Sequence, residues 1–123
     1  KDQALKTGAT PLFTASSFGH SEVVQVLLTA GASKDQANNN GATPLFMASQ
    51  KGHSEVVQVL LTAGASKDQA RNDGATPLSF ASRKGHSEVV QVLLTAGASK
   101  DQARNDGATP LSFASRKGHS EVV

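Results

Sequence analysis

Residues 8–31 decide the fold, and they read GATPLFTASSFGHSEVVQVLLTAG. Thr10 is a good helix N-cap, and Pro11 suits the first helical position, where a backbone N–H has no partner inside the helix. We expect this first helix to run to about Ser17, because Gly19 follows it and favours a helix end.

A second helix is predicted from about His20 to Ala30. Glu22 lies in its first turn, where a negative charge is favourable against the helix dipole. The valines and leucines between residues 23 and 28 form an apolar stripe that is too wide for one neighbour to cover. Gly31 suits the left-handed conformation that often follows a helix C-terminus. One such unit therefore needs neighbours on both sides.

The unit recurs with a period of 33 residues, since the Thr-Pro-Leu triplet begins at Thr10, Thr43, Thr76 and Thr109. We interpret the chain, residues 1–123, as a single domain of four repeats: repeat 1 (1–33), repeat 2 (34–66), repeat 3 (67–99) and the incomplete repeat 4 (100–123). Only seven of the 33 positions differ between repeats, namely 5–7, 13–14 and 17–18 in the numbering of repeat 1.

Stacked repeats would bury the wide stripes, which is the principle of a solenoid. The first helix presents the small Ala15 and Ser16, so its side of the stack should be concave. Asn40-Gly41 and Asp73-Gly74 are turn signals between repeats. The predicted fold is an all-α solenoid of stacked antiparallel helix pairs with projecting β-hairpin-like turns.

These motifs, in register four times, resemble the ankyrin-repeat family. The resemblance rests on Thr-Pro-Leu and on Gly-His-x-x-Val-Val-x-x-Leu-Leu, seen for example in residues 52–61. It implies a non-catalytic module that binds a protein partner through turn tips and the concave first-helix surface.

The chain departs from the family pattern at two positions of the first helix. The usual histidine after Thr-Pro-Leu is replaced by Phe13, Phe46, Ser79 and Ser112, so local hydrogen bonding should be rearranged. The usual second alanine is replaced by Ser16, Ser49, Ser82 and Ser115, whose buried hydroxyls should bond a backbone carbonyl one turn back. The phenylalanine moves from position 13 to position 14 between repeats 2 and 3, which indicates alternative core packing of one aromatic ring.

Composition excludes several classes of protein. The 123 residues contain no cysteine, so neither a disulfide framework nor a thiolate metal site is present. No apolar run is long enough to span a membrane, and residues 1–4 lack the order of a signal peptide. Together these features favour an intracellular location.

Nothing in the pattern predicts catalysis, a cofactor or a metal. Equivalent histidines, such as His20 and His53, should lie about 10 Å apart in stacked repeats, too far apart to share one zinc ion. We expect them to be structural. The glutamates equivalent to Glu22 form a similar row that is best explained as a solvated face.

The charge balance gives little support to nucleic-acid binding. The formal net charge is only +2, from 12 basic and 10 acidic residues. Arg83 and Lys84 belong to a basic strip in the C-terminal half, but Asp73 would partly neutralise it, and Phe80 should be packed away. A solvated face or an acidic protein partner is favoured over nucleic acid.

The variable positions outside the helix core form two groups, which we call the turn tips (5–7 and equivalents) and the helix-end positions (17–18 and equivalents). Exposed positions such as Gln25 and Lys34 stay identical in every repeat that contains them. We therefore predict a recognition surface on a fixed frame, comprising Leu5, Lys6, Thr7, Ser17, Phe18, Asn38, Asn39, Asn40, Gln50, Lys51, Arg71, Asn72, Asp73, Arg83, Lys84, Arg104, Asn105, Asp106, Arg116 and Lys117.

This surface is graded from apolar in repeat 1 to basic in repeats 3 and 4. It predicts a partner with an apolar anchor at one end and acidic groups at the other. Two alternatives stay open: an engineered or idealised scaffold without a dedicated ligand, and a head-to-tail self-assembling array, since no polar capping repeat is evident.

Overall fold

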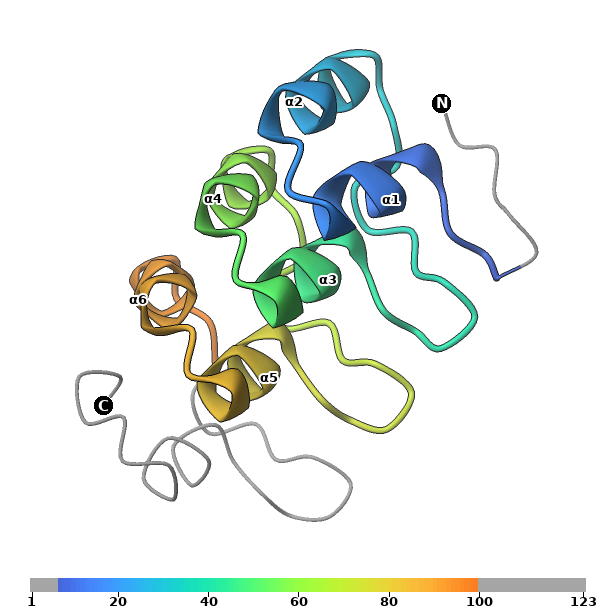
Figure 1. Ribbon diagram of the computed structural model, residues 1–123. Helices are drawn as coiled ribbons and strands as arrows, with labels where there is room; N and C mark the ends of the chain where they lie inside the picture. The colour runs from blue at the N-terminus through green and yellow to red at the C-terminus, as the bar shows by residue number, and fades with distance from the viewer. Residues whose placement is uncertain (1–6, 100–123) are drawn as a thin grey trace.

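The computed structural model describes residues 7–99, which form three helix pairs stacked side by side (Figure 1). These residues contain six helices and no β-strand: α1 (Pro11–Ser17), α2 (Ser21–Thr29), α3 (Pro44–Lys51), α4 (Ser54–Thr62), α5 (Pro77–Lys84) and α6 (Ser87–Thr95). The all-α solenoid predicted from the sequence is confirmed, and repeat 4 lies outside the described residues.

The helices form two rows. The first row contains α1, α3 and α5, and the second contains α2, α4 and α6; each helix packs on its neighbours in the row and on its partner in the pair. The loops between repeats project from the first row, on the side away from the second row (Figure 1). Contacts are more extensive within the first row than within the second, in keeping with the smaller side chains there.

The first helices begin as the sequence predicts. The Thr10 hydroxyl accepts a hydrogen bond of 3.1 Å from the Phe13 backbone N–H, and Thr43 and Thr76 do the same in their repeats. In repeat 3 this bond belongs to a capping box, because the Ser79 hydroxyl also accepts from the Thr76 N–H at 2.8 Å. Serine at position 13 thus gives repeat 3 a hydrogen bond that the phenylalanine at this position cannot make in repeats 1 and 2.

The main core lies between the two rows of helices. Leu45, Val57 and Leu60 of repeat 2 are fully buried there, as are their counterparts in repeat 3. Burial of each such side chain contributes about 1.5–3 kcal/mol, so stacking rather than helix propensity stabilises these short helices.

A second, aromatic cluster lies at the turn side of the first row. It contains Phe13, Phe46 and Phe80 among small alanines, and Phe46 and Phe80 meet edge to face at 5.4 Å between ring centroids. Both positions of the shifted phenylalanine are buried, so the prediction of alternative core packing is confirmed.

Side chains and backbone groups tie successive repeats together. Nε2 of His53 lies 3.0 Å from the carbonyl oxygen of Ser17, and the equivalent distance from His86 to Gln50 is 2.9 Å. The Asp35 carboxylate accepts from the Ser66 N–H at 2.8 Å and so joins the two ends of repeat 2. The structural role predicted for the histidines is confirmed for His53 and His86, which bridge repeats. His119 lies outside the described residues.

The prediction for the buried serines is wrong. Ser16, Ser49 and Ser82 are buried to 1% exposure or less, yet within residues 7–99 their hydroxyls have no hydrogen-bond partner. Each hydroxyl is therefore desolvated without a compensating hydrogen bond.

Candidate partner-binding surface

The described members of the predicted surface all lie at the turn tips or at the C-terminal ends of the first-row helices. Most are exposed, whereas Ser17, Asn38, Gln50 and Arg71 are half-buried. Seven predicted residues lie outside the described part of the chain: Leu5, Lys6, Arg104, Asn105, Asp106, Arg116 and Lys117.

The turn tips are stacked on one another through backbone hydrogen bonds. The Asn39 N–H donates to the Thr7 carbonyl at 2.9 Å, and the Asn72 N–H donates to the Asn40 carbonyl at 2.8 Å. The Asn72 side chain adds a bond between tips, since its Nδ2 donates to the Asn39 carbonyl at 3.1 Å. The two backbone bonds do not depend on which side chains the tips carry.

Each turn is closed by a side chain, but a different one in repeats 2 and 3. In repeat 2 the Asn38 amide oxygen accepts from the Ala42 N–H at 3.0 Å. In repeat 3 the Asp73 carboxylate accepts from the equivalent Ala75 N–H, also at 3.0 Å. In repeat 3 Asp73 therefore makes the bond that Asn38 makes in repeat 2, and the Arg71 side chain is not needed for it.

At the helix-end positions the backbone groups and the side chains also have different roles. The carbonyl groups of Ser17 and Gln50 accept from histidines of the next repeat, while the side chains at these positions vary. Phe18 is 67% exposed, the largest apolar group on this side of repeat 1, although a ring of this size is normally buried.

Repeat 3 gathers cations around the aromatic cluster. The guanidinium carbon of Arg71 lies 5.0 Å from the Phe46 ring centroid and 5.1 Å from that of Phe80. Arg83 and Lys84 approach the Phe80 ring at 5.7 and 5.8 Å. Such cation–π contacts hold the basic side chains in place on an apolar base.

Sequence reasoning missed this arrangement, because it treated Phe80 only as a packed residue and Asp73 only as a neutralising charge. Asp73 instead forms a salt bridge with Arg71, with 2.6 Å between Nη2 and Oδ2. The available signal was that the phenylalanine shift, the arginine and the aspartate all enter the chain in repeat 3.

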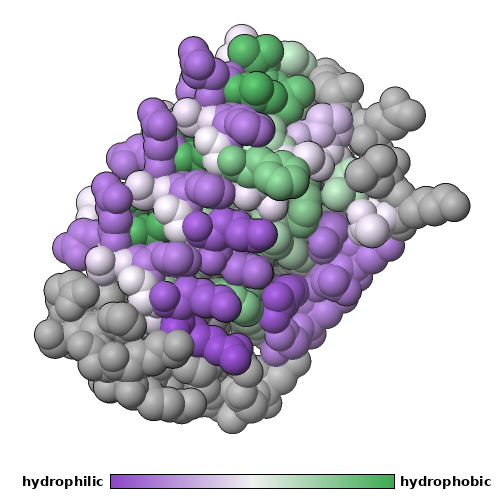
Figure 2. Space-filling view, in the orientation of Figure 1, coloured by the Kyte–Doolittle hydropathy of each residue, from purple (hydrophilic) through white to green (hydrophobic). Residues whose placement is uncertain are grey.

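The hydropathy of the surface changes along the stack (Figure 2). Hydrophobic groups gather at the α1–α2 end, while strongly hydrophilic residues cover the part toward α5 and α6. Phe18 contributes to the apolar end, and the exposed Arg83 and Lys84 contribute to the basic end.

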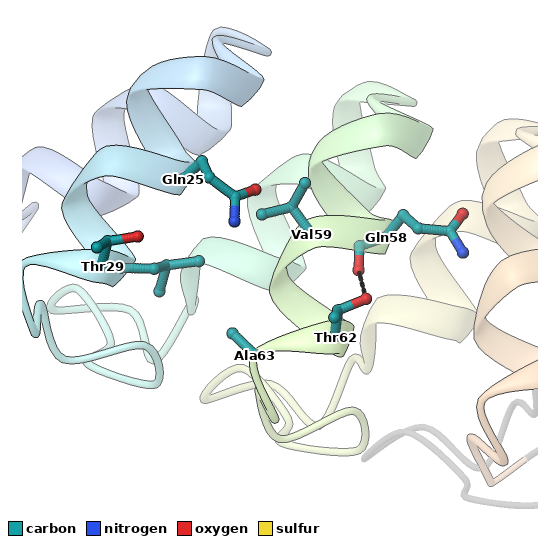
Figure 3. A pocket seen from close by; sticks show the side chains of 7 residues that line it. Gln25, Thr29, Gln58, Val59, Thr62 and Ala63 are labelled. Carbon is teal, nitrogen blue, oxygen red and sulfur yellow. Dashed lines mark hydrogen bonds between the residues drawn. The ribbon is translucent and has the colours of Figure 1, made fainter.

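The opposite, second-row side carries shallow grooves between neighbouring helices. The groove between α2 and α4 has a volume of about 340 Å³ and is lined by Gln25, Leu28, Thr29, Gln58, Val59, Thr62 and Ala63 (Figure 3). The Thr62 hydroxyl donates to the Gln58 carbonyl at 2.9 Å on its wall. A similar groove recurs between α4 and α6, with residues that are identical in the two repeats and include no titratable group.

Residues 7–99 show no grouping of three or more His, Cys, Asp or Glu side chains able to hold a metal ion. Within the same residues, no helix has the length and apolar character needed to cross a membrane.

The fold and surface define a repeat solenoid in which a constant helical frame presents variable turn tips and helix ends. The family model for ankyrin repeats matches residues 1–71 and 65–123, and the chain belongs to that family. Ankyrin repeats are generally protein–protein interaction modules and are typically non-enzymatic. No curated protein matches the chain.

Proposed function

We propose that this chain is a non-catalytic module that binds a protein partner through its turn tips and the first-helix side of the stack. The observation that supports this most strongly is the placement of the variable residues. They lie where main-chain groups bond the neighbouring repeat, and they are mostly exposed, whereas the second-row grooves repeat without change.

The proposed partner is elongated along the stack and changes in character from end to end. Phe18 offers an apolar contact in repeat 1, and an exposed aromatic side chain of this kind is a frequent binding hot spot. Arg83 and Lys84 favour acidic groups on the partner near repeat 3. The equivalent Arg116 and Lys117 would extend the basic region.

The test is affinity capture with two matched variants of the whole chain. In the uniform variant, the turn-tip and helix-end residues of repeats 1 and 2 are replaced by those of repeat 3, which the same frame already accepts. In the outer-face variant, Gln25→Ala and Gln58→Ala alter the second-row grooves. We expect a protein that is retained by the wild-type chain and the outer-face variant but lost from the uniform variant. Retention by the uniform variant, or no specific capture, would instead favour a scaffold without a dedicated ligand.

Head-to-tail self-association is a second candidate, favoured by the apolar face of repeat 1. Val23 is 49% exposed there, whereas its counterpart Val56 is 1% exposed because repeat 1 covers it. The exposed face therefore has the chemistry that another repeat of this sequence would cover. Light scattering after size exclusion, with refractive-index detection, should show a mass that rises with concentration if this candidate is correct. A constant 12.6 kDa would exclude it.

A further inference from the structure

Arg71 is held in an unusually fixed position for an arginine near the surface. Its guanidinium group packs against two aromatic rings, Phe46 and Phe80, at 5.0 and 5.1 Å from their centroids. The side chain is still 26% exposed. An arginine ordered in advance loses less conformational entropy when it binds an anion, which makes it a strong anchor.

Among the described repeats, this arrangement occurs only where repeats 2 and 3 meet. Phe46 occupies position 13 of its repeat and Phe80 occupies position 14, and this shift brings the two rings edge to face beneath Arg71. Repeat 2 has Asn38 at the position of Arg71 and Met47 at the position of Phe80. A binding site here would therefore be singular, although the frame repeats.

The chain itself shows which ligand the site accepts. Asp73 Oδ1 accepts from Arg71 Nε at 3.2 Å, and Oδ2 accepts from Nη2 at 2.6 Å. Two parallel hydrogen bonds of this kind are the preferred geometry between guanidinium and carboxylate. Beside the pair lies a hollow of about 250 Å³, lined by Asn40, Arg71, Asn72 and Asp73, which provides room for an incoming side chain.

We infer that Arg71 binds a carboxylate side chain of an acidic partner segment, and that Asp73 occupies this site in the free protein as an internal competitor. The inference rests on the proposed function and specifies one chemical group of the proposed partner. Asp73 is 49% exposed and keeps its bond to the Ala75 N–H through Oδ1. Its Oδ2 is therefore able to release Arg71 Nη2, which then donates to the ligand carboxylate. Arg83 and Lys84, on the same ring, add attraction for a segment with several acidic residues.

Repeat 2 supplies the test variants, because its turn tip carries asparagine at both positions. Arg71→Asn removes the site, Asp73→Asn removes the competitor but keeps an oxygen for the Ala75 N–H, and the double variant reproduces the turn tip of repeat 2 with unchanged net charge. Lys34→Gln and Glu22→Gln make the same single charge changes far along the chain from the site. The probe is a short fluorescein-labelled peptide of alternating glutamate and serine, with its glutamine counterpart as control, and binding is followed by fluorescence anisotropy.

We expect Arg71→Asn to weaken binding of the glutamate peptide by about fivefold and Asp73→Asn to tighten it by about fivefold, from the usual range for such pairs. The double variant should bind as weakly as Arg71→Asn, and the two control variants should stay within about twofold of the wild type. Circular dichroism of each variant confirms that it is folded.

The inference is overturned if the double variant binds like the wild type, or if the control variants shift the affinity as much as the site variants, since only net charge would then matter. An unchanged affinity in Asp73→Asn would likewise overturn the role of Asp73 as competitor. These outcomes leave the proposed function standing, because affinity capture with the uniform variant tests that function without the peptide. If the uniform variant and Arg71→Asn both still retain the captured partner, the proposed function is instead overturned.

Discussion

Replacing Ser49 by alanine should stabilise the protein. Its hydroxyl, in α3, is fully buried and has no hydrogen-bond partner within the described residues. A buried polar group without a hydrogen bond costs about 1–3 kcal/mol relative to its hydrated state in the unfolded chain. Alanine also has a higher helix propensity than serine, which adds at most about 0.7 kcal/mol.

The measurement is a urea titration followed by far-ultraviolet circular dichroism at a single protein concentration. Ser49→Ala should raise the free energy of unfolding by about 1–3 kcal/mol without changing the slope against urea. Gln58→Ala, at an exposed helical position, is the matched control and should change it by less than about 0.7 kcal/mol.

Equal effects of the two substitutions would mean that helix propensity alone explains the gain. A loss of stability in Ser49→Ala would refute the reasoning directly, because the hydroxyl would then be contributing a favourable bond. Ser16→Ala and Ser82→Ala lie in separate repeats, so their effects should add to that of Ser49→Ala.

Three further substitutions test contacts between repeats and, for Asp35, a contact within repeat 2, each by the same urea titration. Gly52 has φ of 80°, and an added Cβ would lie 2.8 Å from the histidine ring of the next repeat, whereas a Cβ at Gly64 would meet its nearest atom at 3.6 Å. Gly52→Ala should therefore lower the free energy of unfolding by about 1–3 kcal/mol more than Gly64→Ala does. Equal losses would show that the ring moves away freely. Asp35→Ala should cost about 1–2 kcal/mol, because a backbone N–H of repeat 2 loses its charged acceptor at 2.8 Å; a change of a few tenths would show that water replaces it. His53→Ala should lower the free energy of unfolding by about 1–2 kcal/mol, because a carbonyl of repeat 1 loses its donor. His20→Ala, at an exposed ring, should lower it by less than about 0.5 kcal/mol. The reverse order would contradict the bridging role.

Local signals predicted the helices well, because capping chemistry acts over a few residues. Thr43, Pro44 and Gly52 define the limits of α3 whatever lies around them, and the structure confirms each role. The period of 33 residues then predicted the stack, because a stripe such as that of α4 has no other way to be buried. The fold and the helical frame could thus be predicted from the sequence pattern alone.

Contacts across repeats were less accessible. The pairing of His53 with the Ser17 carbonyl depends on the offset between neighbouring helices, which spacing along the chain does not give. The prediction for the buried serines also failed. Ser49 was expected to bond its own helix one turn back, yet its hydroxyl makes no such bond.

The partner-binding role of the candidate surface stays a prediction. The sequence indicated which positions vary, at the turn tips and helix ends, but not which of these side chains meet. The convergence of Arg71 on Phe46 and Phe80 involves three residues from two repeats, and only their three-dimensional packing shows that they meet.

The central claim is that the variable residues on the first-helix side carry partner recognition. Isothermal titration of the captured partner into the wild-type chain, the uniform variant and the outer-face variant tests it most directly. We expect the dissociation constant to rise at least about tenfold for the uniform variant, as loss of hot-spot contacts predicts, and to stay unchanged for the outer-face variant. Equal dissociation constants for the wild type and the uniform variant, or a loss confined to the outer-face variant, would contradict the claim.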